Sequence, residues 1–182
     1  MKLEDVYVIF PAIDEIASHS LRKKTAETLF SAIIAGGWNM ENIHRCPIGK
    51  KFPNAKTNLV EHITCVAACC ISSYDIVKDY PERNKVRFDR DTIICGALLH
   101  DVGKFVEYMD APEGACLSQC GKQMRHPLSG AIIAVQNGLP PEIVQIIAMH
   151  SFEGDNIPHT AESEFIRGID IVAFRAATHG AE

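Results

Sequence analysis

The sequence predicts an all-α protein whose helices pack around a centre. Apolar residues recur at three-to-four spacing in six segments, and residues that cap or terminate helices flank them. No segment alternates apolar and polar residues as a half-buried strand does, and residues 85–88 would give a short extended piece at most. A chain of 182 residues suits one domain with a sizeable core, so we expect a single domain over residues 1–182.

A long connection separates the first two predicted helices. Ser20 is placed to cap the first helix, which the Gly pair at 36–37 ends. Residues 38–56 are rich in Asn, Pro and Gly and are expected to connect the helices. Asn58 caps the second helix, whose apolar stripe continues until Pro81 closes it.

The third predicted helix contains the stretch TIICGALLHD. Either Asp89 or Asp91 caps it, and Gly103 ends it. Residues 108–125 carry Pro and Gly and are expected to form a loop, placed as a flap over a site. Three further helices are expected at residues 126–137, at residues 140–150 and from about residue 162, with a second loop at residues 151–159.

Composition excludes several classes of function. The net charge is −5 and Lys and Arg do not cluster, so we expect no extended nucleic-acid surface. No apolar run approaches the ~18 residues of a membrane span, and the N-terminus does not have the pattern of a signal peptide. Seven cysteines, an odd number, favour a reducing compartment, so we expect a cytoplasmic protein. For Cys116 and Cys120, a redox or metal role and no role at all both stay open.

Six side chains of the types that bind divalent transition metals lie in or beside the apolar segments. They are His62, His100, Asp101, His126, His150 and Asp170. Adjacent residues within a helix point about 100° apart, but a helix end releases the chain from that geometry, so a His and an Asp there can serve one centre. Taken singly, each histidine would more often be a core or surface residue. Five segments that each offer a ligand favour a metal site.

The order H…HD…H…H…D resembles that of the HD-domain superfamily of metal-dependent phosphohydrolases. The matching pieces are NLVEHI, GALLHDVGKF, RHPLSGA, AMHS and GIDIVAF, and they span residues 59–176. The resemblance implies a helical bundle with a metal site at its centre. It places the metal-binding core at residues 58–178, with residues 1–57 as N-terminal helices and a connection.

The resemblance also implies a role for each ligand. His62, His100, Asp101 and Asp170 would hold one metal, and Asp101 would bridge to a second metal that His126 and His150 complete. The cofactors would be two divalent transition-metal ions, with iron or manganese expected first.

Metal-dependent phosphohydrolysis of a small phosphoester or nucleotide is the function we expect, with a hydroxide that bridges the metals as nucleophile. Asp101 and Lys104 would be the catalytic residues, and the partner would be a phosphorylated small molecule. Two alternatives remain open. Some dinuclear members with the same ligand order are di-iron oxygenases that cleave C–C or C–P bonds with O₂, and a non-catalytic regulator would keep the fold without activity.

Four residues are candidates for substrate binding, and each has a structural alternative. Lys104 would neutralise phosphoryl charge, or it would be a solvated lysine at a helix end. Ser129 would touch substrate or hydrogen-bond its own helix. Arg125 and Arg167 would clamp a phosphate or carboxylate, or they would be surface arginines. Gly103 is expected to let the chain leave its helix and bring Lys104 towards the metals. The helical faces leave room for a homodimer.

Overall fold

The structure is a computed structural model that describes residues 1–49, 55–80 and 87–181. Its α-helices are α1 (Leu3–Ile9), α2 (His19–Ala35), α3 (Leu59–Val77), α5 (Arg90–Leu99), α6 (Lys104–Glu107), α7 (Gln119–Gln123), α8 (His126–Gln136), α9 (Pro141–Met149) and α10 (Ala161–Thr178). Short 3-10 helices are η1 (Pro11–Glu15), η2 (Ile43–Arg45) and η3 (Phe152–Gly154), and the two strands are β1 (Tyr108–Met109) and β2 (Cys116–Leu117). The all-α class is confirmed.

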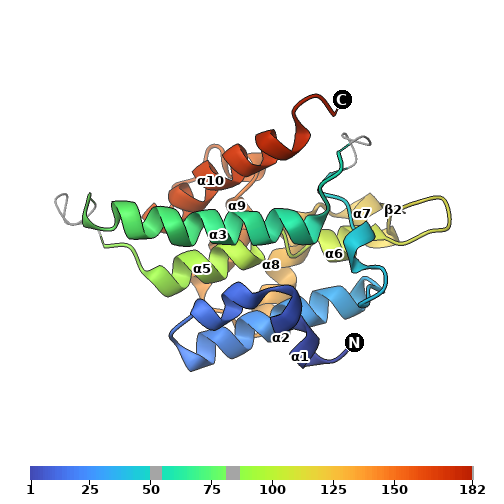
Figure 1. Ribbon diagram of the computed structural model, residues 1–182, viewed down its shortest axis with the longest axis horizontal. Coiled ribbons are helices and arrows are strands. Elements are labelled where there is room, and N and C mark those ends of the chain that lie inside the picture. The colour runs from blue at the N-terminus through green and yellow to red at the C-terminus, as the bar shows by residue number, and fades with distance from the viewer. Residues whose placement is uncertain (50–54, 81–86, 182) are drawn as a thin grey trace.

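The centre of the molecule is formed by α3, α5 and α10, which pack against one another (Figure 1). Asn58 caps α3 as predicted, in a reciprocal capping box with Glu61. Ile63, Val66 and other residues of the inner face are fully buried. By length and composition, α3 is the one helix in the described part of the chain that could cross a membrane, and this buried face is what a core helix has.

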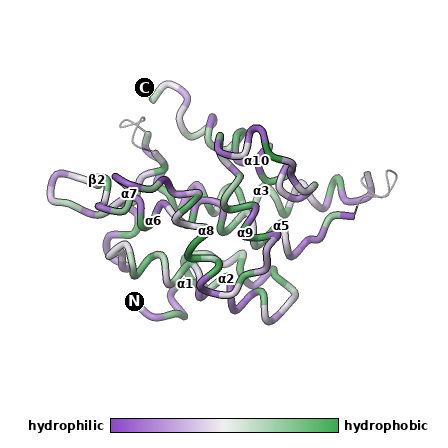
Figure 2. The backbone as a smooth tube through the Cα atoms, turned by 180° about the vertical axis from the view of Figure 1, so that it is seen from behind, coloured by the Kyte–Doolittle hydropathy of each residue, from purple (hydrophilic) through white to green (hydrophobic). Residues whose placement is uncertain are grey.

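The N-terminal segments complete the same core. One buried cluster contains Val6 of α1, Phe10 at the junction of α1 and η1, and Ile13 of η1, together with residues of α3, α5 and α9. Hydrophobic stretches accordingly run through the middle of the chain trace (Figure 2). Residues 1–57 thus supply helices to the core, apart from residues 50–54, which lie outside the described residues.

The first of the predicted helices begins earlier than expected. Ser18 caps α2, with its Oγ accepting from the backbone N–H of Leu21, so the expected cap Ser20 lies inside the helix. Ser18 is fixed in that place by a distant carboxylate, because Asp91 accepts from the N–H groups of Ala17 and Ser18 at 2.8 Å each. A contact between segments so far apart in sequence has no local signal.

The same contact decides the cap of α5. Asp89 accepts from the N–H of Thr92 at 2.7 Å and is the N-cap, whereas Asp91 lies in the first turn and bonds to the segment before α2. The end of α3 is at Val77, and Pro81, expected to close this helix, lies outside the described residues. The expected extended piece at 85–88 is described only for its last two residues, which have no regular structure.

Residues 108–125 form a small hairpin and a helix where a loop was expected. Tyr108 pairs with Leu117 and Met109 with Cys116, and α7 follows. Gly114, with φ of 113°, lies in the connection between the strands. Strands of two residues are too short to show alternation, so the sequence pattern could not reveal them.

The short helix α6 is held closely on several sides. The indole N–H of Trp38, which is buried, donates to the carbonyl of Phe105 at 2.7 Å. A Cβ at Gly36 would overlap that same carbonyl, and a Cβ at Gly103 would overlap the carbonyl of His126 in α8. Gly103 was expected to end the third helix and let the chain turn away from it. That expectation is wrong, because α5 already ends at Leu99 and Gly103 has ordinary helical φ and ψ. It is needed for the close approach of two backbones.

Candidate metal centre

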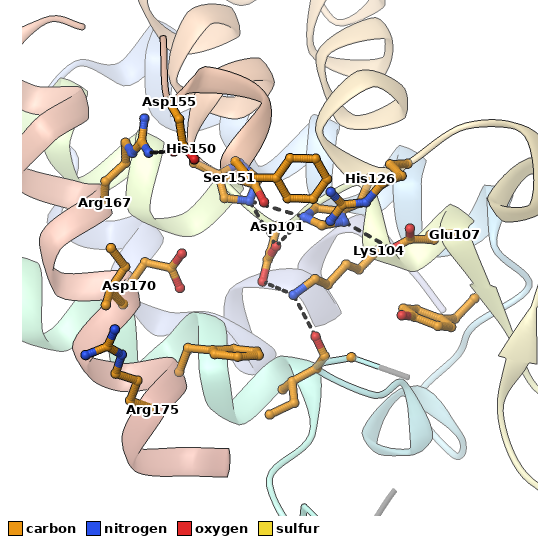
Figure 3. A pocket seen from close by; sticks show the side chains of 17 residues that line it. Asp101, Lys104, Glu107, His126, His150, Ser151, Asp155, Arg167, Asp170 and Arg175 are labelled. Atoms are coloured by element: carbon orange, nitrogen blue, oxygen red, sulfur yellow. Dashed lines mark hydrogen bonds and ion pairs between the residues drawn. The ribbon is translucent and has the colours of Figure 1, made fainter. Parts of the chain in front are cut away.

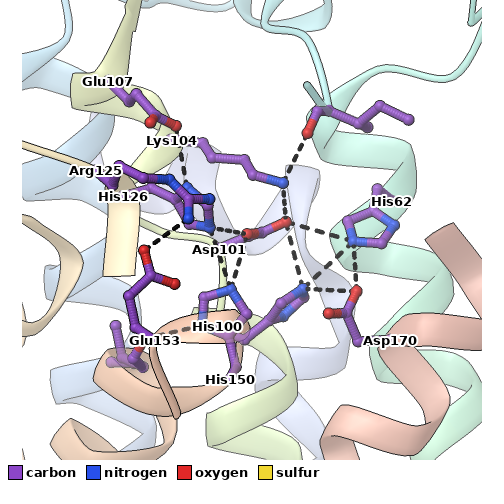
Figure 4. Close-up of polar contacts among 12 residues, drawn as sticks. His62, His100, Asp101, Lys104, Glu107, Arg125, His126, His150, Glu153 and Asp170 are labelled. Atoms are coloured by element: carbon purple, nitrogen blue, oxygen red, sulfur yellow. Dashed lines mark hydrogen bonds and ion pairs between the residues drawn. The ribbon is translucent and has the colours of Figure 1, made fainter. Parts of the chain in front are cut away.

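The six predicted ligands converge at the centre of the helices (Figure 4). His62 lies in α3, His100 and Asp101 follow the last residue of α5, His126 opens α8, His150 follows α9 and Asp170 lies within α10. The four histidines and Asp101 are buried, and the side chain of Asp170 is 18% exposed. They form two groups, His62 with His100 and Asp170, and Asp101 with His126 and His150.

In the first group the histidines meet around one carboxylate oxygen. The Nε2 atom of His62 lies 3.0 Å from Oδ1 of Asp170 and 3.4 Å from Nε2 of His100. The Nε2 atom of His100 is 3.6 Å from the same Oδ1 atom. Three donor atoms suited to a divalent metal therefore face one point.

Asp101 lies between the two groups, with one oxygen towards each. Its Oδ1 atom is 3.3 Å from Nε2 of His126 and 3.3 Å from Nε2 of His150. Its Oδ2 atom is 3.4 Å from Nε2 of both His62 and His100. The carboxylate thus offers one ligand atom to each histidine pair.

The hydrogen bonds of the other ring nitrogens define the tautomers. Nδ1 of His100 lies 2.7 Å from the carbonyl of Ala97, and Nδ1 of His150 lies 2.8 Å from the carbonyl of Ile147. A carbonyl only accepts, so each Nδ1 carries the proton and each neutral ring presents a lone pair at Nε2. Outer contacts of this kind orient histidines that bind metals.

Glu107 does the same for His126, and the sequence analysis missed it. Its Oε2 atom lies 3.1 Å from Nδ1 of His126, and both side chains are buried. His62 differs, because its buried Nδ1 atom has no hydrogen-bond partner among the described residues. In the sequence, Glu107 is marked only by its position three residues after Lys104 in an apolar segment, which does not identify it as the partner of His126.

These residues fit a metal on structural grounds. The Nε2 atoms of His126 and His150 are 3.3 Å apart, so two neutral rings would face each other with their lone pairs. Two nitrogens bound at about 2.1 Å to one metal lie roughly 3.0–3.4 Å apart in octahedral or tetrahedral geometry. A cation between the rings removes the repulsion at the spacing observed.

Without a metal, the electrostatic surroundings favour a charged His100 and a neutral His126. Burial lowers the pKa of His100, but the charges of Asp101 and Asp170 outweigh burial and raise it to about 10. Burial lowers the pKa of His126 to about 4, despite its hydrogen bond to Glu107. The pKa of Asp101 lies well below its usual range, because Lys104 and His100 together outweigh the effect of burial.

Lys104 is buried beside the ligands and is not a solvated lysine. Its Nζ atom donates to Oδ2 of Asp101 and to the carbonyl of Ile48, both at 2.7 Å. The residue is 6% exposed. Its ammonium therefore compensates the charge of the carboxylate that faces both histidine pairs.

A cavity of about 830 Å³ opens onto the centre (Figure 3). It is lined by Ile48, Gly49, Asp101, Lys104, Glu107, Tyr108, Arg125, His126, His150, Ser151, Phe152, Asp155, Arg167, Asp170, Ile171, Phe174 and Arg175. His62 and His100 are not among these residues. The segment 151–155 contributes three residues, and the segment 108–125 contributes Tyr108 and Arg125.

The candidate substrate-binding residues differ in their positions. Ser129 does not line the cavity, and its Oγ atom lies 3.4 Å from the carbonyl of His126 and 3.5 Å from that of Arg125, in its own helix. Arg125 lines the cavity and bonds to Glu153 at 2.6 Å. Arg167 lines it too and bonds to Asp155 at 2.6 Å (Figure 3).

Two other sequence features have clear positions. His159 lies with its Nδ1 atom 2.9 Å from Oγ of the buried Ser163, next to Arg167 and outside the cavity lining. Cys116 is exposed and Cys120 is half-buried. Within the described parts of the chain, neither cysteine belongs to a group of metal-ligand type. Arg175, which the sequence analysis did not single out, lines the cavity from the last turns of α10.

Comparisons with known proteins agree with this arrangement. The family model described as HD domain matches residues 60–174, more than half of the chain. A curated protein similar to the chain is the dihydroneopterin 2′,3′-cyclic phosphate phosphodiesterase of Methanocaldococcus jannaschii, 26% identical over 152 residues. The match covers 80% of this chain and 58% of that protein's length. No solved structure matches the chain. With the family model spanning all six converging side chains, the chain belongs to the HD-domain family.

Proposed function

We propose that the protein is a metal-dependent phosphohydrolase that acts on a small phosphoester and holds two divalent metal ions. The observation that carries the proposal is the place of Asp101, whose two oxygens each face a different histidine pair at 3.3–3.4 Å. His62, His100 and Asp170 would hold one ion with Asp101, and His126 and His150 would hold the other. Imidazole and carboxylate ligands suit iron and manganese.

Two such ions, when bound, would supply hydroxide at neutral pH and would neutralise charge on the phosphate oxygens. The chain's own residues add positioning. Lys104 keeps Asp101 ionised, and two of its three ammonium donors are used by Asp101 and Ile48. Within the described residues the third donor has no acceptor, so it is available to a phosphoryl oxygen in the cavity that Lys104 lines.

The charge of the cavity favours an anionic substrate. Among the described residues, four cationic side chains line it, Lys104, Arg125, Arg167 and Arg175, and four acidic ones do so, Asp101, Glu107, Asp155 and Asp170. These eight charges cancel, so two divalent ions and one hydroxide would leave three positive charges there. The volume of about 830 Å³ falls in the range of small-molecule sites. A phosphorylated small molecule, and not an extended nucleic acid, is the partner we propose.

Cyclic phosphodiesters are the first substrates to examine. The similar archaeal protein is a 2′,3′-cyclic phosphate phosphodiesterase, and the match covers 80% of this chain. The identity of 26% does not carry the pterin part of that substrate across. We therefore propose the phosphodiester bond, and no particular alcohol, as the shared feature.

Hydrolysis of bis(p-nitrophenyl) phosphate by metal-depleted protein reloaded with Mn²⁺ or Fe²⁺ tests the proposal. Asp101→Asn is expected to lower both the metal content and the rate, the rate by at least about 100-fold, because a shared ligand is lost. Asp14→Asn, on an exposed carboxylate of η1, is the matched control and should match the wild type. Unchanged metal content and rate in Asp101→Asn would refute the shared-ligand role.

The same preparation separates hydrolase from oxygenase. A hydrolase releases the alcohol under anaerobic conditions and leaves the oxidation state of its metals unchanged. A mixed-valent iron signal in electron paramagnetic resonance that responds to substrate, together with O₂ uptake and no anaerobic turnover, would instead establish the di-iron oxygenase.

A further inference from the structure

Phe152 is a large aromatic residue that the fold leaves exposed on the wall of the cavity. It lies in η3, two residues after His150, and it is 64% exposed. It lines the same cavity as Asp101 and His150. An apolar ring left in water gives up the stabilisation that burial would provide, and aromatic side chains that line a cavity are typical of small-molecule sites.

The ring is held from one side by Arg125. The guanidinium carbon of Arg125 lies 4.2 Å from the centre of the Phe152 ring. Arg125 in turn donates to Oε1 of Glu153 at 2.6 Å (Figure 4). The guanidinium charge therefore has a carboxylate partner, and the guanidinium group lies over the ring as a cation–π contact. Arg125 is better placed as a support for Phe152 than as a clamp for phosphate.

Phe152 lines the cavity and stays 64% exposed with Arg125 packed against it, so part of the ring is open to a ligand in the cavity. Tyr108 and Phe174 line the same cavity, so the wall is aromatic as well as cationic. Stacking on an aromatic side chain is open to any flat ring, because every such ring has a π-face.

We propose that Phe152 is a specificity-determining residue that stacks on a flat aromatic ring of the substrate, while the phosphoryl group lies at the metal ligands. The inference rests on the proposed function for the place of the phosphoryl group. It adds the class of alcohol, namely one that carries a planar heterocycle such as a nucleobase. The support from Arg125 fixes the tilt of the ring before the ligand arrives.

Equilibrium binding tests this inference without turnover. Dissociation constants are measured by calorimetry, in the presence of Mn²⁺, for adenosine 2′-monophosphate and for 1-O-methyl-ribofuranose 2-phosphate, which has methoxy in place of the base. The wild type is expected to bind the first ligand about 10-fold more tightly, the size of a single stacking contact. The ratio of the two constants cancels the contribution of the phosphate.

Three variants locate the preference. Phe152→Ala should bring the ratio close to one by weakening only the adenosine ligand, and Phe152→Tyr should keep the ratio because it keeps a flat ring. Val135→Ala, on an exposed apolar residue of α8 that does not line the cavity, is the control and should keep the wild-type ratio.

Each result has a defined meaning. Equal affinity of the wild type for both ligands, or no binding of either, would overturn the inference. An equal loss for both ligands in Phe152→Ala would also overturn it, since Phe152 would then merely support its segment. Absence of hydrolysis of any phosphoester with the ring preference intact would overturn the proposed function and leave the ring site standing.

Discussion

Glu107→Gln tests whether Glu107 orients His126 as the metal ligand that we propose. Oε2 of Glu107 lies 3.1 Å from Nδ1 of His126, and the two residues are 6% and 5% exposed. Water therefore screens this contact little. Glutamine has nearly the same shape and can still accept from Nδ1, so the substitution removes the charge and keeps the hydrogen bond.

The size of the effect follows from that difference. A hydrogen bond to a charged group contributes about 1.5–3 kcal/mol and a neutral one about 0.5–1.5 kcal/mol. The loss is therefore about 1–1.5 kcal/mol, which is about a 10-fold weaker metal affinity. The pKa of His126 should fall further, because the bond to Glu107 raises it while burial holds it at about 4. A less basic imidazole is a weaker ligand.

The assay is competition for the metal with a chromophoric chelator, which reads the affinity of each site. Of the two metals that we propose, the one at His126 should be bound about 10-fold more weakly in Glu107→Gln, and the other should keep its affinity. Glu113→Gln, on an exposed residue between the two strands, is the matched control. Equal weakening at both sites, or none at either, would refute the assignment of Glu107 to His126 alone.

Two further predictions concern packing and pH. Gly103→Ala should lower the free energy of unfolding by more than about 2 kcal/mol in urea titrations, because its Cβ overlaps the carbonyl of His126. Gly168→Ala, in the exposed part of α10 with no atom near its Cβ, should raise it by about 0.5–1 kcal/mol, and a loss there would contradict the packing argument. Burial raises the pKa of the Cys95 thiol from 9.0 to about 12, so the folded protein holds this proton more tightly and should lose stability as pH rises from 9 towards 12. Cys95→Ala should remove part of that loss, and an unchanged pH profile would show that the thiol does not contribute to it.

The sequence predicted the candidate metal ligands well where a residue of ligand type stands at or near the end of a helix. His126 opens its helix as predicted, with a proline in the first turn. The helix expected at residues 140–150 also has a proline in its first turn, and it ends at Met149, directly before His150. The convergence of six ligands followed from the family resemblance and from the helix ends, and the structure brings all six together.

Features decided by contacts between distant segments could not be predicted. Ser20 is the cap expected from the sequence, and the cap is Ser18 instead because the carboxylate of Asp91 accepts from the N–H groups of Ala17 and Ser18. Glu107 resembles any acidic residue of a helix, and only burial against His126 reveals its role. Phe152 stands in an irregular segment, where periodicity carries no information about exposure.

The hydrogen bond from the indole N–H of Trp38 to the carbonyl of Phe105 makes the intrinsic fluorescence of the protein sensitive to α6. Trp38 is the only tryptophan of the chain, and it is 2% exposed. Its partner Phe105 follows Lys104 directly and lies in the helix that also carries Glu107. Indole emission depends on the polarity and hydrogen bonding around the N–H group, so the intrinsic fluorescence reports on this helix without any added label. Metal loading, ligand entry and local unfolding around the centre can thus be followed in unmodified protein.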